Sequence, residues 1–499
     1  MRNLSKTKLL AYRQCRKRLW LEIHRPELRS DSTATQASFA VGNQVGEIAR
    51  QLYDPKGRGA LIDPKLEGFD TALARSMVLL ASSKPIFEAG FAADGALAFA
   101  DVMLPVRRGG KRAWRMVEVK SSTSVKDYHR DDACIQAYVA QTAGVPLAGI
   151  ALAHIDSDWV YPGGSDYDGL LVEHDLTAEA FGRAEEVKAW IAEAQTTSRR
   201  RTAPKQGTGN HCADPYECGF LAHCQSQESK TEYPVQWLPR VQNKALKALI
   251  ENDGLRDMRH VPDELLNAKQ LRVKKHSLSG KPFFDATNAA AALAPLKAPF
   301  YFLDFETIQF AVPIWKGTRP FQQIPFQFSV HHLSRTGKLR SEAFLDLTGK
   351  DPSKPFAEAL IASCGARGPV FVYNAAFEKT RIKELAVRFP KINSALLAIN
   401  ERVVDLLPVA EQHYYHPSQQ GSWSIKKVLP AIAPDLRYEA LDGVQNGGMA
   451  MTAYMEAISP KTSSARREKI RQQLLDYCGL DTFAMVRLWR FFTGAQEAE

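Results

Sequence analysis

The sequence predicts an α/β protein with mixed sheets and more than one domain, on three observations. The chain has 499 residues, which is too long for one ordinary hydrophobic core. In both halves, short runs that alternate like strands precede longer segments with helical periodicity. A polar stretch and short helical segments separate the two halves. We therefore expect a first domain at residues 1–235, a helical linker at 236–298 and a second domain at 299–499.

The composition is that of an ordinary globular protein, with 45% hydrophobic and 24% charged residues. The chain has no apolar run of about 20 residues and no signal-peptide pattern, so we expect a cytoplasmic protein without membrane contact. Its formal net charge of +10 favours a polyanionic partner, most simply nucleic acid, although many basic proteins bind none. Seven cysteines in a cytoplasmic chain of this size argue against a disulfide framework.

Charged side chains mark two neighbouring strands that we expect in the first domain. Residues 96–106 alternate like a strand and carry Asp101. Residues 114–123 predict the next strand, with Glu118 and Lys120 on one face. Two carboxylates can bind a metal ion, and an adjacent lysine can orient or activate the attacking water. These three residues are therefore candidates for a metal-dependent hydrolytic site.

Two helices complete this pattern. Residues 41–53 predict a helix that holds Glu47 near its apolar side, although an exposed helix glutamate is the alternative interpretation. Residues 131–145 predict a helix with Gln136 and Tyr138 just after the second strand. In this order the motifs resemble the RecB-type PD-(D/E)xK nucleases, in particular the CRISPR-associated and helicase-linked branch that carries an iron–sulfur cluster. The resemblance implies a restriction-endonuclease-like fold and a nuclease site made of Glu47, Asp101, Glu118, Lys120, Gln136 and Tyr138, with Asp101 and Glu118 as metal ligands.

Four cysteines form a second group. Cys212, Cys218 and Cys224 follow one another at two equal five-residue gaps, and Cys15 lies among basic residues near the N-terminus. Structural zinc sites usually space paired ligands by two to four residues, so these gaps favour a larger cluster. A zinc site, or Cys15 as a core residue beside an incomplete trio, is the alternative. The resembling nuclease branch joins one N-terminal cysteine to three C-terminal ones, which implies a [4Fe–4S] cluster on these four residues.

The second domain opens on an acidic strand, YFLDFET at residues 301–307. Alternate side chains of a strand share a face, so Asp304 and Glu306 point the same way. Paired carboxylates suit Mg²⁺ or Mn²⁺, whereas a solvent-exposed acidic pair is the alternative interpretation. Residues 324–333 and 341–347 read as two further strands. Three antiparallel strands with an acidic pair on the first suggest an RNase H-like fold.

Later segments add further acidic residues. A buried strand at 370–373 runs into a helix, with Asn374 as a possible N-cap and Glu378 four residues on. The final helix, residues 471–492, places Tyr477 and Asp481 on one face because they are four positions apart.

The order D-x-E, N-x3-E and Y-x3-D resembles the Tyr-bearing branch of the DEDD superfamily of 3′→5′ exonucleases. That superfamily holds two divalent metals with four carboxylates; one metal activates a water and the other stabilises the leaving 3′ oxygen. The resemblance implies metal binding by Asp304, Glu306 and Asp481 and a water positioned by Tyr477. It also implies Glu378 as the fourth carboxylate, where the superfamily usually has Asp, with Asp405 held in reserve.

Together, the two resemblances imply a metal-dependent nuclease of an uncharacterised bacterial-type family, acting on DNA rather than RNA, in DNA repair or mobile-element defence. The linker faintly resembles helix-hairpin-helix modules that grip nucleic-acid backbones. Because the chain has no G-x4-G-K-[ST] motif, a helicase or ATPase partner would be separate. One alternative is a nucleic-acid-binding scaffold with one or both nuclease sites inactive, because Gly46 stands where the first family often has histidine and Glu378 where the second usually has Asp. Another is an RNA-processing exonuclease.

Overall fold

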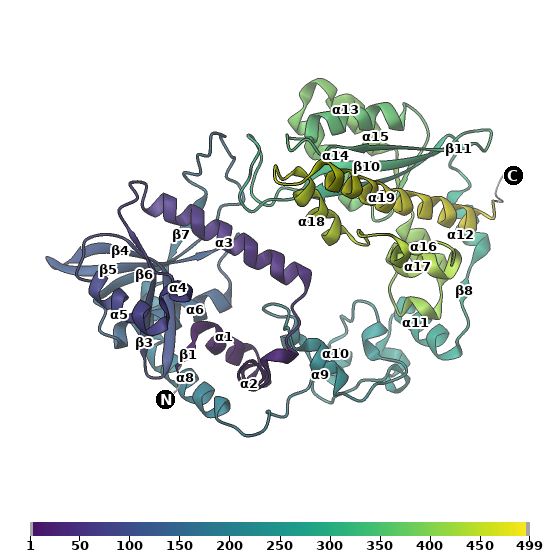
Figure 1. The fold of residues 1–499 in the computed structure, drawn as a ribbon. Coiled ribbons are helices and arrows are strands. Elements are labelled where there is room, and N and C mark those ends of the chain that lie inside the picture. The colour runs from purple at the N-terminus through teal and green to yellow at the C-terminus, as the bar shows by residue number, and fades with distance from the viewer. Residues whose placement is uncertain (1–2, 496–499) are drawn as a thin grey trace. The chain divides into compact units, whose positions relative to one another are not determined.

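The computed structural model describes residues 3–495, apart from the side chains of Thr33 and Ala34, and it divides into two compact units (Figure 1). Unit 1 holds the chain up to Ser229 together with Phe310–Phe321, and unit 2 holds Lys230–Gln309 and the chain from Gln322 onwards. The sequence-based division differs from this one at two places. Residues 236–298, expected as a linker, pack within unit 2, and the segment that follows the acidic strand packs within unit 1.

Unit 1 is built on a seven-stranded mixed sheet in the order β2-β3-β4-β5-β6-β7, with β1 paired to β4. Strands β3, β4 and β5 form an antiparallel meander, whereas β6 runs parallel to β5 and antiparallel to β7. The parallel pair requires a crossover, which helix α6 provides. The strands are β1 Leu4–Ser5, β2 Ala60–Leu61, β3 Ile86–Ala93, β4 Ala96–Arg108, β5 Lys111–Lys120, β6 Leu147–Ile155 and β7 Leu171–Asp175.

Different helices pack against the two faces of this sheet. On one face, Trp114 and Met116 of β5 join Ile135 of α6 in the main core. On the other, Val119 of β5 packs with Val45 of α3. Because side chains alternate along a strand, residue 118 faces α6 and not α3. The helices are α1 Lys6–Gln14, α2 Arg16–His24, α3 Thr33–Tyr53, α4 Pro64–Glu67, α5 Phe69–Leu79, α6 Asp127–Thr142, α7 Thr177–Gly182, α8 Ala184–Ser198 and α9 Leu221–Ser226.

Unit 2 is built on a five-stranded mixed sheet in the order β11-β10-β9-β12-β13. Strand β10 is antiparallel to β9 and to β11, as the sequence predicts, whereas β12 and β13 run parallel to β9. A small antiparallel pair, β8 with β14, lies outside this sheet. The strands are β8 Phe283–Phe284, β9 Phe300–Ile308, β10 Ile324–Leu333, β11 Leu339–Leu345, β12 Val370–Val372, β13 Val403–Asp405 and β14 Tyr414–Tyr415.

Helices cover both faces of the unit 2 sheet. Phe300 and Phe302 of β9 pack with Met485 of the long C-terminal helix α19, whereas Leu303 and Phe305 pack in the core that α13, α14 and α15 cover. The even-numbered side chains of β9 therefore face α19. The helices are α10 Lys244–Glu251, α11 Ala268–Ser279, α12 Ala286–Leu293, α13 Ser353–Cys364, α14 Ala376–Arg388, α15 Asn393–Glu401, α16 Leu407–His413, α17 Ile425–Ile432, α18 Gly447–Ile458 and α19 Ser464–Thr493.

At the level of fold class, the prediction of an α/β protein with mixed sheets is confirmed. Across residues 3–495, every helix is too short or too polar to serve as a bilayer-spanning segment.

Candidate functional site

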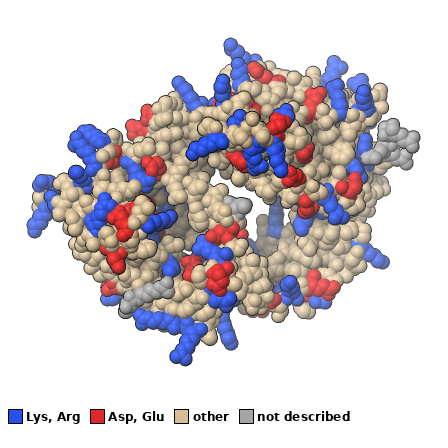
Figure 2. All heavy atoms as spheres, in the orientation of Figure 1, with Lys and Arg blue, Asp and Glu red and all other residues tan. Residues whose placement is uncertain are grey.

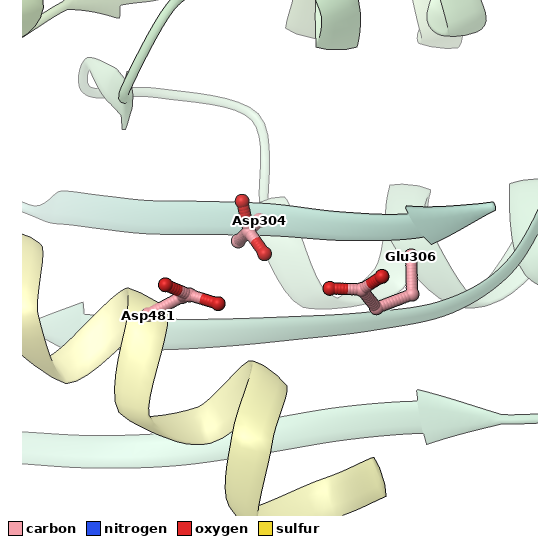
Figure 3. Close-up of side chains that lie close together, drawn as sticks. All are labelled: Asp304, Glu306 and Asp481. Carbon is pink, nitrogen blue, oxygen red and sulfur yellow. The ribbon is translucent and has the colours of Figure 1, made fainter. Parts of the chain in front are cut away.

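Three carboxylates of unit 2 converge on one point (Figure 3). Asp304 and Glu306 project from the α19 face of β9, two positions apart, and Asp481 projects toward them from α19. Their ligand oxygens all lie within 4.8 Å of one another. Among residues 3–495, this is the one group of three or more Asp, Glu, His or Cys side chains that meets this closely. The structure therefore brings together three of the residues that the sequence analysis names as metal ligands.

Polar bonds between β10 and α19 fix the position of Asp481. Gln327, opposite Glu306 in the sheet, donates its amide to the Leu474 carbonyl of α19 at 2.7 Å. Ser329, opposite Asp304, bonds the Thr482 hydroxyl at 2.9 Å. Both contacts are buried, where a hydrogen bond is strong and an unmade one is costly. They hold α19 in register along the strand beside the acidic pair.

Burial shifts the pKa values of all three carboxyls upward, and repulsion from neighbouring carboxylates adds to the shifts of Asp304 and Glu306. Burial raises the pKa of Asp304 well above its ordinary value, and the nearby Asp481, Glu306 and Glu378 add to this. Burial raises the pKa of Glu306 to about 8 and that of Asp481 to about 6. A carboxyl group whose pKa is raised in this way has too little positive charge around it to stabilise its ionised form. A divalent cation would supply that charge, and oxygen donors at this spacing suit Mg²⁺ or Mn²⁺.

Glu378, the fourth predicted ligand, lies near enough to Asp304 to affect its pKa, although it is not one of the three carboxylates that meet within 4.8 Å. Its side chain is 3% exposed, and its Oε2 atom has no hydrogen-bond partner. Burial raises the pKa of Glu378 to about 8, and Glu378 in turn raises the pKa of Asp304. A buried carboxylate oxygen without a partner is uncommon and is expected to have a function. Glu378 therefore fits a metal ligand better than a structural residue.

Asp405, the reserve ligand, binds backbone N–H groups. Its carboxylate accepts hydrogen bonds from the backbone N–H groups of Asn374 and Ala375, at 2.9 and 3.0 Å, and of Leu407 at 2.9 Å. Asn374 was expected to cap α14, but it adopts a left-handed conformation with φ of 75°, and no side chain caps the helix start. The Asp405 carboxylate supplies these contacts because the parallel β12–β13 pair places it there.

Two residues beside the triad were not predicted as part of the site. Tyr438, in the 3₁₀ turn Tyr438–Ala440, donates its hydroxyl to Asp481. Lys426, at the start of α17, donates to the Tyr477 hydroxyl at 3.2 Å and to the Gln445 carbonyl at 2.8 Å. Tyr477, the predicted water-positioning residue, is thus at the site and 5% exposed. The turn that carries Tyr438 has no periodic pattern, so sequence gave no local signal for it.

Unit 1 brings together a second charged cluster. Glu118 is 1% exposed and pairs with Lys120 at 2.6 Å and with Lys6 at 2.8 Å. Asp132 of α6 pairs with the same two lysines, at 2.6 and 3.6 Å. Gln136, one helical turn after Asp132, donates its amide to Glu118 at 2.6 Å and to Asp132 at 3.2 Å. Lys6 and Asp132 were not predicted, although the four-residue spacing from Asp132 to Gln136 could have indicated the latter.

Asp101 also belongs to this cluster. Its carboxylate accepts the Val119 N–H at 2.7 Å, beside Glu118. Glu88 of β3 lies opposite Asp101 in the register of the sheet and has a left-handed backbone conformation, with φ of 59°. Burial raises the pKa of Asp101 and raises that of Glu118 to about 7. Burial alone would raise the pKa of Asp132, but Lys120 and Lys6 outweigh it and hold the value low.

Glu47 and Tyr138 do not join the cluster. Glu47 is exposed and pairs with Arg50 of the same helix. It lies on α3, which packs on the sheet face opposite to Glu118. Tyr138 donates its hydroxyl to Asp94 at 2.5 Å. Residues two positions apart on a helix point in nearly opposite directions, so Tyr138 cannot share a face with Gln136.

The four predicted cluster cysteines line one cavity in unit 1: Cys15, Cys212, Cys218 and Cys224. Cys15 lies between α1 and α2, and the others come from the loop before α9 and from α9 itself. Burial raises the pKa values of Cys15, Cys218 and Cys224, although Arg18 opposes this at Cys218 and Lys17 at Cys224. Within the described residues, no three of these sulfurs lie within 4.8 Å of one another. A single tetrahedral zinc would hold its sulfurs closer than that, because Zn–S bonds are about 2.3 Å.

Positive charge is spread over the surface. Lys and Arg side chains cover the visible face of each unit with Asp and Glu among them, and no single basic patch stands out (Figure 2).

Comparison with known proteins finds similarity to one domain family and to one uncharacterised protein. A family described as "Domain of unknown function (DUF2779)" matches residues 301–424, which include Asp304, Glu306 and Glu378 but not Asp481. An "Uncharacterized protein MG366 homolog" from Mycoplasma pneumoniae (strain ATCC 29342 / M129 / Subtype 1) is 28% identical over 215 residues. The match covers 39% of this chain and 32% of that protein, so the chain spans about a third of that relative's length. Neither similarity assigns an activity.

Proposed function

We propose that the protein is a metal-dependent nuclease with its principal site at Asp304, Glu306 and Asp481 of unit 2. The observation that carries the proposal is the convergence of these carboxylates within 4.8 Å, with the unpartnered Glu378 beside them. Four oxygen ligands of this kind fit a pair of divalent ions, which would stabilise the attacking and leaving oxygens of a phosphodiester.

The topology of unit 2 supports this assignment. In chain order within the sheet, its strands run 3-2-1-4-5, with the first three antiparallel and the last two parallel to the first. This is the arrangement expected of an RNase H-like fold. The acidic pair lies on the central strand, and Asp481 comes from the helix on that face. The order of Asp304, Glu306, Glu378, Tyr477 and Asp481 also agrees with the resemblance to DEDD exonucleases.

The chain's own residues define what the unit 2 site does. Asp304, Glu306 and Asp481 would hold the ions, and Glu378 would complete the ligand set. The Tyr477 hydroxyl would orient the water that attacks the phosphorus, because it lies at the edge of the triad and Lys426 fixes its position. Contacts from Gln327 and Ser329 to α19 keep the ligands from both elements in place.

For unit 1, we propose a PD-(D/E)xK-type nuclease site made of Asp101, Glu118, Lys120 and Gln136. The antiparallel meander β3–β5, the crossover α6 and the parallel β6 agree with that fold. Lys6 pairs directly with Glu118, so Lys6 and a divalent ion would compete for this carboxylate. That competition, and the exposed Glu47, favour a second candidate for unit 1: a nucleic-acid-binding module that does not cleave.

We also propose that Cys15, Cys212, Cys218 and Cys224 hold a [4Fe–4S] cluster. Four thiols that line one cavity support it. Iron and acid-labile sulfide near four of each per chain, with absorbance near 400 nm that reduction bleaches, is the expected result for anaerobically purified protein; these figures are about what one such cluster provides. Stoichiometric zinc without iron would contradict it.

The decisive experiment is digestion of end-labelled single-stranded DNA and RNA with Mg²⁺ or Mn²⁺. We expect wild type to give a 3′-shortening ladder on DNA that Asp304→Asn abolishes. Glu401→Gln is the matched control, because it removes an exposed carboxylate from the same unit. A ladder that survives Asp304→Asn would place the activity elsewhere.

The same assay separates the two candidates for unit 1. Glu118→Gln should remove any cleavage that persists in Asp304→Asn, whereas the exposed Glu185→Gln should not. Binding without such cleavage would favour the non-cleaving module. Cleavage of RNA alone would favour an RNA-processing exonuclease. The setting in DNA repair or mobile-element defence, with a separate helicase or ATPase, stays a prediction.

A further inference from the structure

Lys426 is a cation beside the acidic triad of unit 2, where it contacts Tyr477. Two of its three N–H groups are used, one by the Gln445 carbonyl at 2.8 Å and one by the Tyr477 hydroxyl at 3.2 Å. Within residues 3–495, no ion pair joins Lys426 to a carboxylate, yet its charge lowers the pKa values of Glu306 and Asp481. The ammonium therefore lies close to the triad, and both of the hydrogen bonds described for it go to other groups.

Two aromatic rings hold this ammonium in place. Its Nζ atom lies 4.8 Å from the ring centre of Tyr438 and 4.9 Å from that of Tyr477. Cation–π contacts of this kind are strongest where water is excluded, and both tyrosines are buried. The same two residues flank Asp481. A flexible lysine is thus fixed in one position beside the site, with one donor unused.

Charge balance shows what this donor is suited to bind. Two divalent ions would neutralise the four carboxylates Asp304, Glu306, Glu378 and Asp481, and would leave the phosphate of a bound substrate with its negative charge. Lys426 offers one matching positive charge at the edge of the ligand set. Lys427, the next residue, is exposed and lies 3.4 Å from Gln420 instead, so it offers no such charge to the site.

We infer that Lys426 is a catalytic residue of the unit 2 site, whose free N–H binds the phosphate group of the terminal nucleotide. This inference rests on the proposed nuclease function and adds a substrate contact to it. Because the inferred contact is with the phosphate, its strength should not depend on the base or the sugar of the nucleotide.

The test measures binding of thymidine 5′-monophosphate and of thymidine to Mn²⁺-loaded full-length protein by calorimetry. We expect K426Q to weaken monophosphate binding roughly 10- to 100-fold, as for a lost hydrogen bond to a charged group. Thymidine binding and Mn²⁺ affinity, measured by electron paramagnetic resonance, should not weaken. K426R should stay within a few-fold of wild type, and K427Q should match it.

Several outcomes would overturn the inference. The first is monophosphate binding by K426Q that is as tight as in wild type. The second is a loss of Mn²⁺ affinity in K426Q as large as the loss of monophosphate affinity, because this would show that Lys426 acts by holding the metal ligands in place. If K426Q does not fold, K426A tests the same contact, and monophosphate binding as tight in K426A as in wild type would overturn the inference. Failure of wild type both to bind the monophosphate and to cleave any oligonucleotide would overturn the proposed function itself.

Discussion

Lys6 Nζ lies 2.8 Å from Glu118 Oε1, although 112 positions separate the two residues in the chain. Lys6 is the first residue of α1, which follows the short strand β1. Strand β1 pairs with β4, and this pairing carries the start of the chain to the sheet beside Glu118. Lys6 and Lys120 together neutralise two buried carboxylates, Glu118 and Asp132.

Replacing Lys6 with alanine should therefore destabilise unit 1 in the absence of metal. Removing one partner of a buried pair costs about 3–5 kcal/mol, and because Lys120 remains we expect about 2 kcal/mol here. The melting temperature should fall by roughly 4–8 °C. Mn²⁺ should restore part of this loss, because it can replace the missing positive charge. Lys56→Ala, which removes an exposed lysine, is the control and should leave the melting temperature unchanged. If Mn²⁺ raises the melting temperature of Lys6→Ala no more than that of wild type, the proposed metal site of unit 1 is contradicted.

The sequence predicts the parts of both sites that follow from local periodicity. Alternation along a strand places Asp304 and Glu306 on one face, and helical spacing places Asp481 near Tyr477. The prediction that Tyr138 shares a site with Gln136 disagrees with helical periodicity, because the two residues are only two positions apart. In the structure Tyr138 points to Asp94 instead.

Other contacts have no local signal at all. Lys6 reaches Glu118 only because β1 pairs with β4, a contact between residues far apart in sequence. Tyr438 and Lys426 meet Asp481 and Tyr477 because a 3₁₀ turn and the start of α17 pack beside α19. Such contacts depend on tertiary packing, which a single sequence does not specify.

Glu306 gives a pH dependence with a definite sign. Burial raises its pKa from 4.5 to about 8, so the folded protein favours the neutral acid. The resulting stability is complete below pH 4.5 and is lost as the pH rises through about 8. The metal-free melting temperature should therefore fall across this range, and less steeply in Glu306→Gln. At pH 8, Mg²⁺ or Mn²⁺ should raise the melting temperature of wild type more than that of Glu306→Gln. Parallel pH curves for both proteins, with Glu401→Gln as the reference, would show that Glu306 is not the group responsible.

Removing the charge of Glu378 and removing the charge of Asp405 should have opposite effects on stability and on Mn²⁺ affinity. Glu378→Gln removes a buried charge whose Oε2 has no partner, so the metal-free protein should be as stable as wild type or more stable, while Mn²⁺ affinity falls. Asp405→Asn weakens the three hydrogen bonds that begin α14 and α16, so stability should fall by about 1–2 kcal/mol with Mn²⁺ affinity retained. Calorimetric melting and Mn²⁺ titration on each variant distinguish them. The reverse result would make Asp405 the fourth ligand.

Gln14 should control how firmly the cysteine cavity retains its cluster. Its side-chain amide donates to the carbonyls of His211, Asp214 and Tyr216, at 2.8, 3.3 and 2.7 Å. These bonds tie the loop of Cys212 and Cys218 to the helix that ends before Cys15, so they hold cysteines from distant segments around one cavity. Gln14→Ala should fold, because α1 keeps its buried Leu9 and Tyr12, but it should lose iron faster than wild type during dialysis against a chelator.

The readout for Gln14→Ala is iron content and absorbance over time, which does not depend on nuclease activity. Gln44→Ala is the matched control, because Gln44 is exposed on α3 and distant in sequence from every cysteine of the cavity. Equal rates of iron loss in Gln14→Ala and wild type would mean that the cysteines hold the loop without help from Gln14. Faster loss in both glutamine variants would indicate general destabilisation. Only selective loss in Gln14→Ala supports the view that α1 and the cysteine loop form one metal-binding unit, whose other end places Lys6 beside Glu118.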